Sequence, residues 1–135
     1  MSMLHLKLDT KNNLQPLNSH GINSHTLSLF YGTSTNDPEA LLDCYVNKIK
    51  DGGARVYDIN DMHDYAKCFV RPGDYLRIRS DCSSSIHDES SAHIAASILL
   101  CGDNVLASIH ALNSEQAFKR FKTLMELGFA LNAEV

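Results

Sequence analysis

Residues 92–112 read AHIAASILLCGDNVLASIHAL, which is two apolar runs joined by the short segment CGDN at 101–104. A Gly-Asp pair between two apolar runs is typical of a tight β-hairpin. Both runs are almost continuously apolar, and this is typical of strands that are covered on both faces. The stretch therefore predicts a central antiparallel hairpin with strands at 92–100 and 105–112.

Three shorter stretches predict further strands of the same sheet. Residues 75–79 alternate apolar side chains with arginine after a Pro-Gly-Asp turn, and residues 26–30 also alternate. Leucines alternate at residues 4–8, within a segment, 1–25, that is otherwise expected to be irregular. Alternation with a period of two is typical of half-exposed strands, so we expect a small antiparallel sheet of roughly four to six strands.

Two helices are predicted by their capping residues. An Asp-Pro pair at 37–38 begins one helix and the glycine pair at 52–53 ends it. Asn113 begins a C-terminal helix that covers the sheet and ends at Gly128. These residue types are favoured at helix ends because they cap the backbone or stop the helix. The sequence thus predicts an α+β fold in a single domain, 1–135.

Two polar segments are expected to connect these elements. Residues 58–66 predict a short helix or a turn, and residues 81–91, which are rich in serine, predict a mobile surface loop.

The composition excludes several classes of protein. The chain has 135 residues, 44% of them hydrophobic, and its 12 Lys+Arg against 16 Asp+Glu give a net charge of -4. Apart from a cluster at Lys119, Arg120 and Lys122 the basic residues are scattered, so no nucleic-acid partner is expected. The longest apolar stretch, 94–101, is far shorter than the ~20 residues of a membrane span, so no membrane insertion is expected.

The start of the chain lacks the pattern of a Sec signal peptide. We therefore expect a protein that is cytoplasmic when made and that either stays there or is exported or injected by a specialised secretion system.

The four cysteines form no Cys-x-x-Cys pair. A zinc ribbon and a thioredoxin-like motif are therefore not expected, and free thiols are the default. His87, Asp88, Glu89 and His93 would be the candidate metal ligands, but contiguous residues on the serine-rich segment are usually solvated, so we expect no metal and no cofactor.

Four short motifs follow one another in an order that resembles the NlpC/P60 superfamily of papain-like cysteine peptidases and amidases. In that family a Tyr- and Gly-containing segment precedes an Asp-Cys nucleophile on a helix, a Pro-Gly-Asp turn introduces a strand, and the catalytic histidine begins the next strand. The matching residues here are Tyr31 with GTS at 32–34, Asp43-Cys44, PGD at 72–74 and His93.

The resemblance implies a cysteine hydrolase that cleaves an amide bond through an acyl-enzyme. Cys44 would be the nucleophile, His93 the base and then the acid, and Tyr31 a substrate-binding residue. A thiol needs such a partner because little of it is thiolate at neutral pH. A third group must orient the imidazole. The predicted hairpin makes His110 the diagonal neighbour of His93, and a longer turn would bring Asn113 there instead.

By the same resemblance the substrate would be a peptide, most simply a peptidoglycan stem peptide, and the protein a secreted toxin, an injected effector or a phage-type enzyme. Other interpretations stay open. Cys44 also fits a small buried core residue, His93 a solvated one, His110 a structural one, and Tyr31 plain loop packing. The pair Asp81-Cys82 mimics the nucleophile motif locally. The competing function is a non-catalytic α+β binding module, such as an immunity protein, a secretion chaperone or an assembly factor, with a dimer or partner surface.

Overall fold

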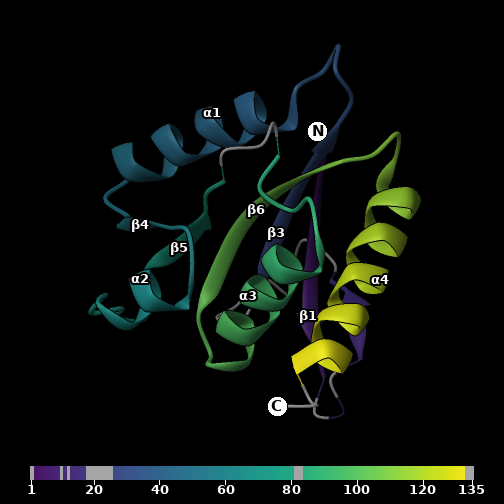
Figure 1. The fold of residues 1–135 in the computed structure, drawn as a ribbon. Helices are drawn as coiled ribbons and strands as arrows, with labels where there is room; N and C mark the ends of the chain where they lie inside the picture. The colour runs from purple at the N-terminus through teal and green to yellow at the C-terminus, as the bar shows by residue number, and fades with distance from the viewer. Residues whose placement is uncertain (1, 10, 12, 18–25, 81–83, 133–135) are drawn as a thin grey trace.

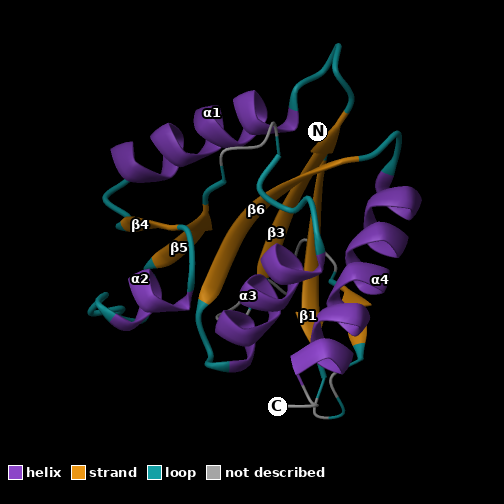
Figure 2. Ribbon diagram, in the orientation of Figure 1, coloured by secondary structure: helices purple, strands orange, loops and turns teal. Residues whose placement is uncertain are grey.

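A six-stranded mixed sheet forms the middle of the molecule, with helices packed against it (Figures 1 and 2). The computed structural model describes residues 2–9, 11, 13–17, 26–80 and 84–132. The strands are β1 (Met3–Leu8), β2 (Leu14–Pro16), β3 (Leu27–Gly32), β4 (Val56–Ile59), β5 (Tyr75–Ile78) and β6 (Asn104–His110). The helices are α1 (Pro38–Asp51), α2 (Met62–Ala66), α3 (Glu89–Leu100) and α4 (Ser114–Asn132).

The strand order is β2-β1-β3-β6-β5-β4, and the four strands from β3 to β4 in this order are parallel. Strand β1 runs antiparallel to both of its neighbours, β2 and β3. The α+β class is therefore confirmed, while the expectation of a wholly antiparallel sheet is wrong. Parallel neighbours need crossover connections, and here helices supply them.

The predicted strand at 92–100 is the principal error of the sequence analysis, because these residues lie in helix α3. Asp88 caps the helix in a reciprocal capping box with Ser91, and the apolar run that follows is rich in alanine, a strong helix former. Ala92, Ala95 and Ala96 of this run are all fully buried. The hairpin is thus replaced by a helix followed by a strand, β6, that pairs in parallel with β5.

The two faces of the sheet carry different helices. Phe30 on β3 and Leu106 on β6 pack against Leu42 and Val46 of α1. The alternate residues on the same strands, such as Leu29 and Ala107, belong to a larger core with α3 and α4. The sheet therefore separates α1 from the pair formed by α3 and α4, with one core cluster on each face.

Both predicted helices form, and one is longer than expected. Asp37 caps α1 by accepting a hydrogen bond from the Glu39 amide, and Gly52 caps its other end. Asn113 accepts from the Gln116 amide at the start of α4. The helix continues past Gly128 to Asn132, so the expected end at Gly128 is wrong.

The smaller segments agree with the sequence analysis in part. Strand β1 confirms the alternation at residues 4–8, but β2 and β4, which have three and four residues, were not predicted. Helix α2 confirms the short helix expected within 58–66. Ser84 and Ser85 are buried rather than in a mobile surface loop, and residues 81–83, including Cys82, lie outside the described part of the chain.

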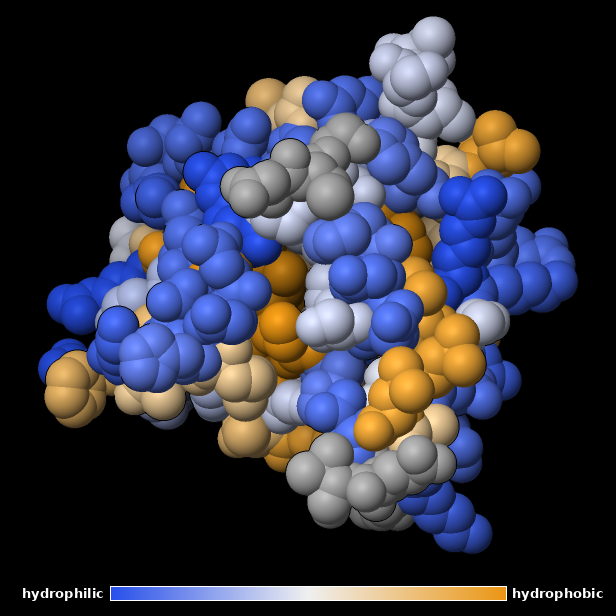
Figure 3. Space-filling model, viewed as in Figure 1, coloured by the Kyte–Doolittle hydropathy of each residue, from blue (hydrophilic) through white to orange (hydrophobic). Residues whose placement is uncertain are grey.

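Within the residues described, no helix combines the length and apolarity that crossing a membrane would require. Apolar surface nevertheless gathers on the face of the molecule that carries α3 and α4 (Figure 3). Leu127 and Leu131 of α4 are 50% and 58% exposed.

Candidate functional site

The connections of β3 and β6 create a switch point in the sheet. These neighbouring parallel strands end together, with Gly32 beside His110. From β3 the chain passes to α1 on one face, and from β6 it passes to α4 on the other. In sheets with helices on both faces, ligands bind in the crevice at the carboxyl ends of strands whose connections diverge in this way.

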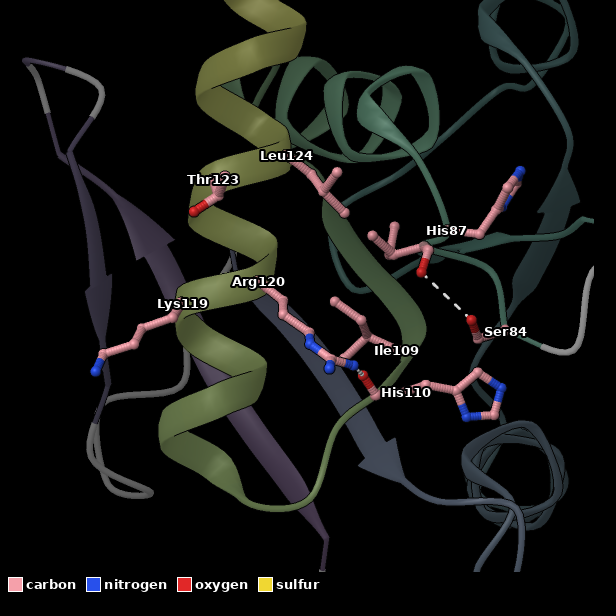
Figure 4. Close-up of a pocket in the computed structure, with 9 residues that line it drawn as sticks. Ser84, His87, Ile109, His110, Lys119, Arg120, Thr123 and Leu124 are labelled. Carbon is pink, nitrogen blue, oxygen red and sulfur yellow. Dashed lines mark hydrogen bonds between the residues drawn. The ribbon is translucent and has the colours of Figure 1, made fainter.

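A groove of about 540 Å³ lies on the α4 side of this switch point (Figure 4). This volume falls in the range of small-molecule sites. The apolar floor includes Ile109 of β6 and Ile86, which is bridged to Ile109 in parallel. The other described lining residues are Ser84, His87, His110, Lys119, Arg120, Thr123 and Leu124.

A second hollow, of about 380 Å³, adjoins this groove. Both share His110 and Arg120. Its other described walls come from residues 32–34 at and after the end of β3, from residues 111–112 after β6, and from Gln116 of α4. No carboxylate occurs among the described lining residues of either hollow.

Arg120 is the cation placed at the groove. Its Nη1 donates a 2.6 Å hydrogen bond to the carbonyl oxygen of His110, so the guanidinium is held at the end of β6. Figure 4 shows Arg120 and Leu124 reaching from α4 toward this strand, whereas Lys119 points away from it. The Lys119 Nζ instead lies 2.9 Å from the Glu115 carboxylate. The positive charge of the groove therefore centres on one arginine.

The two histidines of the groove lie across β6 from α4 (Figure 4). The His87 ring lies 3.4 Å from the Ser85 carbonyl oxygen through Nδ1 and 3.4 Å from the Asp88 carboxylate through Nε2. His110 offers its backbone carbonyl to Arg120, and Figure 4 shows its ring turned away from α4.

A buried network under α1 holds the end of β6 and the segment before α3 in place. The hydroxyl of Ser108 donates to Glu39 at 2.5 Å, and the Ser108 amide donates to the Ser85 hydroxyl at 2.6 Å. Arg77 of β5, only 4% exposed, pairs with Glu39 at 2.9 Å and with Asp43. These contacts join α1, β5, β6 and Ser85 into one unit.

Burial alone would lower the pKa of Arg77, but its hydrogen bonds with Asp43 and Glu39 outweigh burial and raise that pKa. Arg77 therefore stays charged and paired. Asp43, which the sequence analysis placed beside a nucleophile, is a partner of this buried arginine.

The structure does not bring Cys44 and His93 together. Cys44 is an exposed residue in the second turn of α1. His93 lies on α3, where its ring packs edge-on against Phe129 of α4 with centroids 5.4 Å apart. Because α1 and α3 cover opposite faces of the sheet, the sheet stands between the two side chains. Cys44 also lies too far inside α1 to benefit from the field of the helix N-terminus.

The remaining predicted residues take other places. His110 is not a diagonal strand neighbour of His93, because residue 93 lies in a helix. Asn113 caps α4. Tyr31 of β3 pairs in register with Ile109, a residue of the groove floor. Of the predicted set, His110 lines the groove and Tyr31 lies beside it.

Sequence reasoning did not assign Arg120, Leu124 and Ile86 to a site. The basic cluster at 119–122 was the available signal for Arg120, but only the path of α4 across the end of β6 shows which of its members reaches the groove. Within the described ranges, no group of three or more His, Cys, Asp or Glu side chains could hold a metal ion.

Comparisons of the chain with protein-family models, curated proteins and solved structures found no significant match.

Proposed function

We propose that this chain is a binding module that holds an anionic ligand with an apolar body in the groove at the carboxyl end of β6. The observation that carries the proposal is Arg120, which is held at the end of β6 beside an apolar floor and without a carboxylate among the described lining residues. A cation at the edge of an apolar surface favours a ligand that has both characters.

The surroundings of Arg120 support this assignment. The whole chain carries a net charge of -4, so a groove whose charge is positive stands out from the average surface. A guanidinium offers five N–H donors, and the bond to the His110 carbonyl uses one of them while fixing the orientation of the planar group. An arginine held in this way loses less conformational entropy when it binds an anion.

The amide hydrolase suggested by the NlpC/P60 resemblance is the competing proposal. It would need a base other than His93, because the sheet lies between α1 and α3. The peptide or peptidoglycan substrate, the delivery by a specialised secretion system and an immunity or dimer partner rest on that resemblance and on composition, and they stay predictions. A binding module needs no pair of catalytic cysteine and histidine side chains, and it therefore agrees better with the described side chains.

Calorimetric titration with a pair of matched small molecules tests the proposal. Phenylacetate carries the carboxylate and phenylacetamide is its neutral counterpart. We expect phenylacetate to bind at least tenfold more tightly, since a hydrogen-bonded ion pair contributes about 1.5–3 kcal/mol.

Two variants locate the site. Arg120→Gln should weaken phenylacetate binding at least tenfold, whereas Lys122→Gln, which removes the same charge from an exposed position outside the groove lining, should leave it unchanged. Equal losses in both variants, or no binding of either molecule by the wild-type protein, would contradict the proposal.

A further inference from the structure

The groove does not end at Leu124 but continues into an exposed apolar stripe on α4. Leu124 lines the groove, and Leu127 and Leu131 follow it at helical spacings of three and four residues. Figure 3 shows apolar surface gathered on this face of the molecule. Arg120 lies one helical turn before Leu124, so a cation lies at one end of the stripe.

From these features we infer that the ligand of the groove is the C-terminal end of a peptide whose last residue is apolar. The inference rests on the proposed function, because it names the chemistry of the same ligand. The terminal carboxylate would pair with the Arg120 guanidinium, whose fork matches a carboxylate in two parallel hydrogen bonds. The last side chain would lie on Ile86, Ile109 and Leu124.

The rest of the peptide runs along α4 toward Leu131. Leu124 and Leu131 are about 10 Å apart along the helix axis, a length that an extended chain covers with about three residues. Carboxylate capture combined with pockets for apolar side chains is a recurrent mode of peptide recognition.

The charge at Arg120 is positive, whereas the net charge of the chain is negative. Arg120 lies at the groove, and no carboxylate occurs among the described lining residues, so the charge there is positive in a protein of net charge -4. A free carboxylate is attracted by this field, whereas a peptide amide is not.

A first set of probes tests the terminal residue by calorimetry on the intact chain. N-acetyl-leucine should bind at least tenfold more tightly than N-acetyl-leucinamide, which lacks the charge, and than N-acetylglycine, which lacks the side chain. Phenyl phosphate serves as an anion of different geometry and should bind more weakly than N-acetyl-leucine. Tighter binding of phenyl phosphate would overturn the inference while leaving an anion site in place. Equal binding of the neutral amide would overturn both the inference and the proposed anion site.

A second set of probes tests the direction of the bound peptide. It also distinguishes a peptide ligand from a free acylated amino acid. The tetrapeptide Ac-Val-Ala-Val-Leu should bind more tightly than N-acetyl-leucine. The double substitution Leu127→Gln with Leu131→Gln should remove this gain, at least threefold, without changing the binding of N-acetyl-leucine. Leu112→Gln, at an exposed residue of the adjoining hollow, is the matched control and should have no effect on either probe.

The outcomes of this second set are distinct. Loss of tetrapeptide affinity in Leu112→Gln, with none in the double variant, would overturn the direction along α4. Equal affinity of tetrapeptide and N-acetyl-leucine would overturn the peptide in favour of a small acylated amino acid. If no anion of either set binds, the proposed function fails together with the inference. Circular dichroism of each variant checks that these surface substitutions leave the fold intact.

Discussion

Gly128 of α4 lies directly against His93 of α3: a Cβ at residue 128 would come within 2.8 Å of the His93 Cβ and 2.6 Å of the Glu89 carbonyl oxygen. Such contacts are too short for any real side chain. The absence of a side chain therefore lets the two helices approach closely, and this glycine serves helix packing. His93, predicted as a catalytic base, is one wall of that packing.

Substitution Gly128→Ala should lower the free energy of unfolding by about 1–3 kcal/mol, because the added methyl group must push α3 and α4 apart. The substitution also improves helix propensity by ~1 kcal/mol, so a net loss identifies the packing effect. Gly52→Ala is the control, since its nearest contact to a built Cβ is 3.4 Å. Urea unfolding should show little change for Gly52→Ala, and an unchanged or stabilised Gly128→Ala would refute the close packing.

The two acidic partners of Arg77 should differ in their contribution to stability. Glu39 is 21% exposed and also accepts from Ser108, whereas Asp43 is 55% exposed. Glu39→Ala should destabilise by about 2–4 kcal/mol, because it removes the shared acceptor of buried Arg77 and Ser108. Asp43→Ala should cost less than about 1 kcal/mol. Denaturant midpoints of both variants measure the difference, and similar losses would contradict the described network.

His5 should make the stability of the protein depend on pH. Burial lowers the pKa of His5 below its ordinary value of 6.5, so the folded protein favours the neutral imidazole. The corresponding stability is present above the unfolded-state pKa and is lost as the pH falls through the lowered folded-state pKa. Unfolding free energies of wild type and His5→Gln from pH 8 to pH 5 should diverge below about pH 6.5, with the wild type losing more. Parallel curves would show that His5 is not responsible.

Cys44→Ala should change the free energy of unfolding by less than about 0.5 kcal/mol, because the side chain is exposed on α1. His93→Ala should cost more, about 1–2 kcal/mol, since it removes the contact with Phe129. Neither substitution should affect phenylacetate binding. Release of amine from peptidoglycan fragments by the wild type, abolished by Cys44→Ala, would instead favour the hydrolase proposal.

The sequence predicted those elements whose signals are local. The Asp37 cap with Pro38 located α1, Asn113 located the start of α4, and alternation located β1, β3 and β5. Each signal acts within a few residues and does not depend on what packs nearby.

The sequence does not reveal helix α3 because apolar residues occupy its less buried face as well as its buried one. Ile94 is half-buried and Leu100 is exposed, so the run shows no amphipathic period and resembles a buried strand. The signals for a helix were its length, its alanines and the capping pair Asp88 and Ser91. The Gly102-Asp103 turn favoured a hairpin instead. A strand at 92–100 makes His93 and His110 neighbours, so this error also produced His110 as the predicted third member of the triad, whereas Cys44 and His93 came from the resemblance.

The groove could not be predicted for a related reason. Its residues come from the segment before α3, the end of β6 and the middle of α4, and the first two are joined by the parallel bridge between Ile86 and Ile109. Pairing between segments so distant in sequence leaves no local pattern. Gly128 likewise resembles a helix end. The sequence does not distinguish a glycine that lets a partner helix pack closely from a glycine that stops a helix.

The binding of an anion at Arg120 is tested most directly by a ¹⁵N-resolved NMR titration of the wild-type chain with N-acetyl-leucine. The account predicts saturable shifts at the amides of Ile86, Ile109, Arg120 and Leu124, no shift at Cys44, and loss of these shifts in Arg120→Gln. Saturable shifts confined to α1, or no saturable shift at the groove in the wild type, would contradict it.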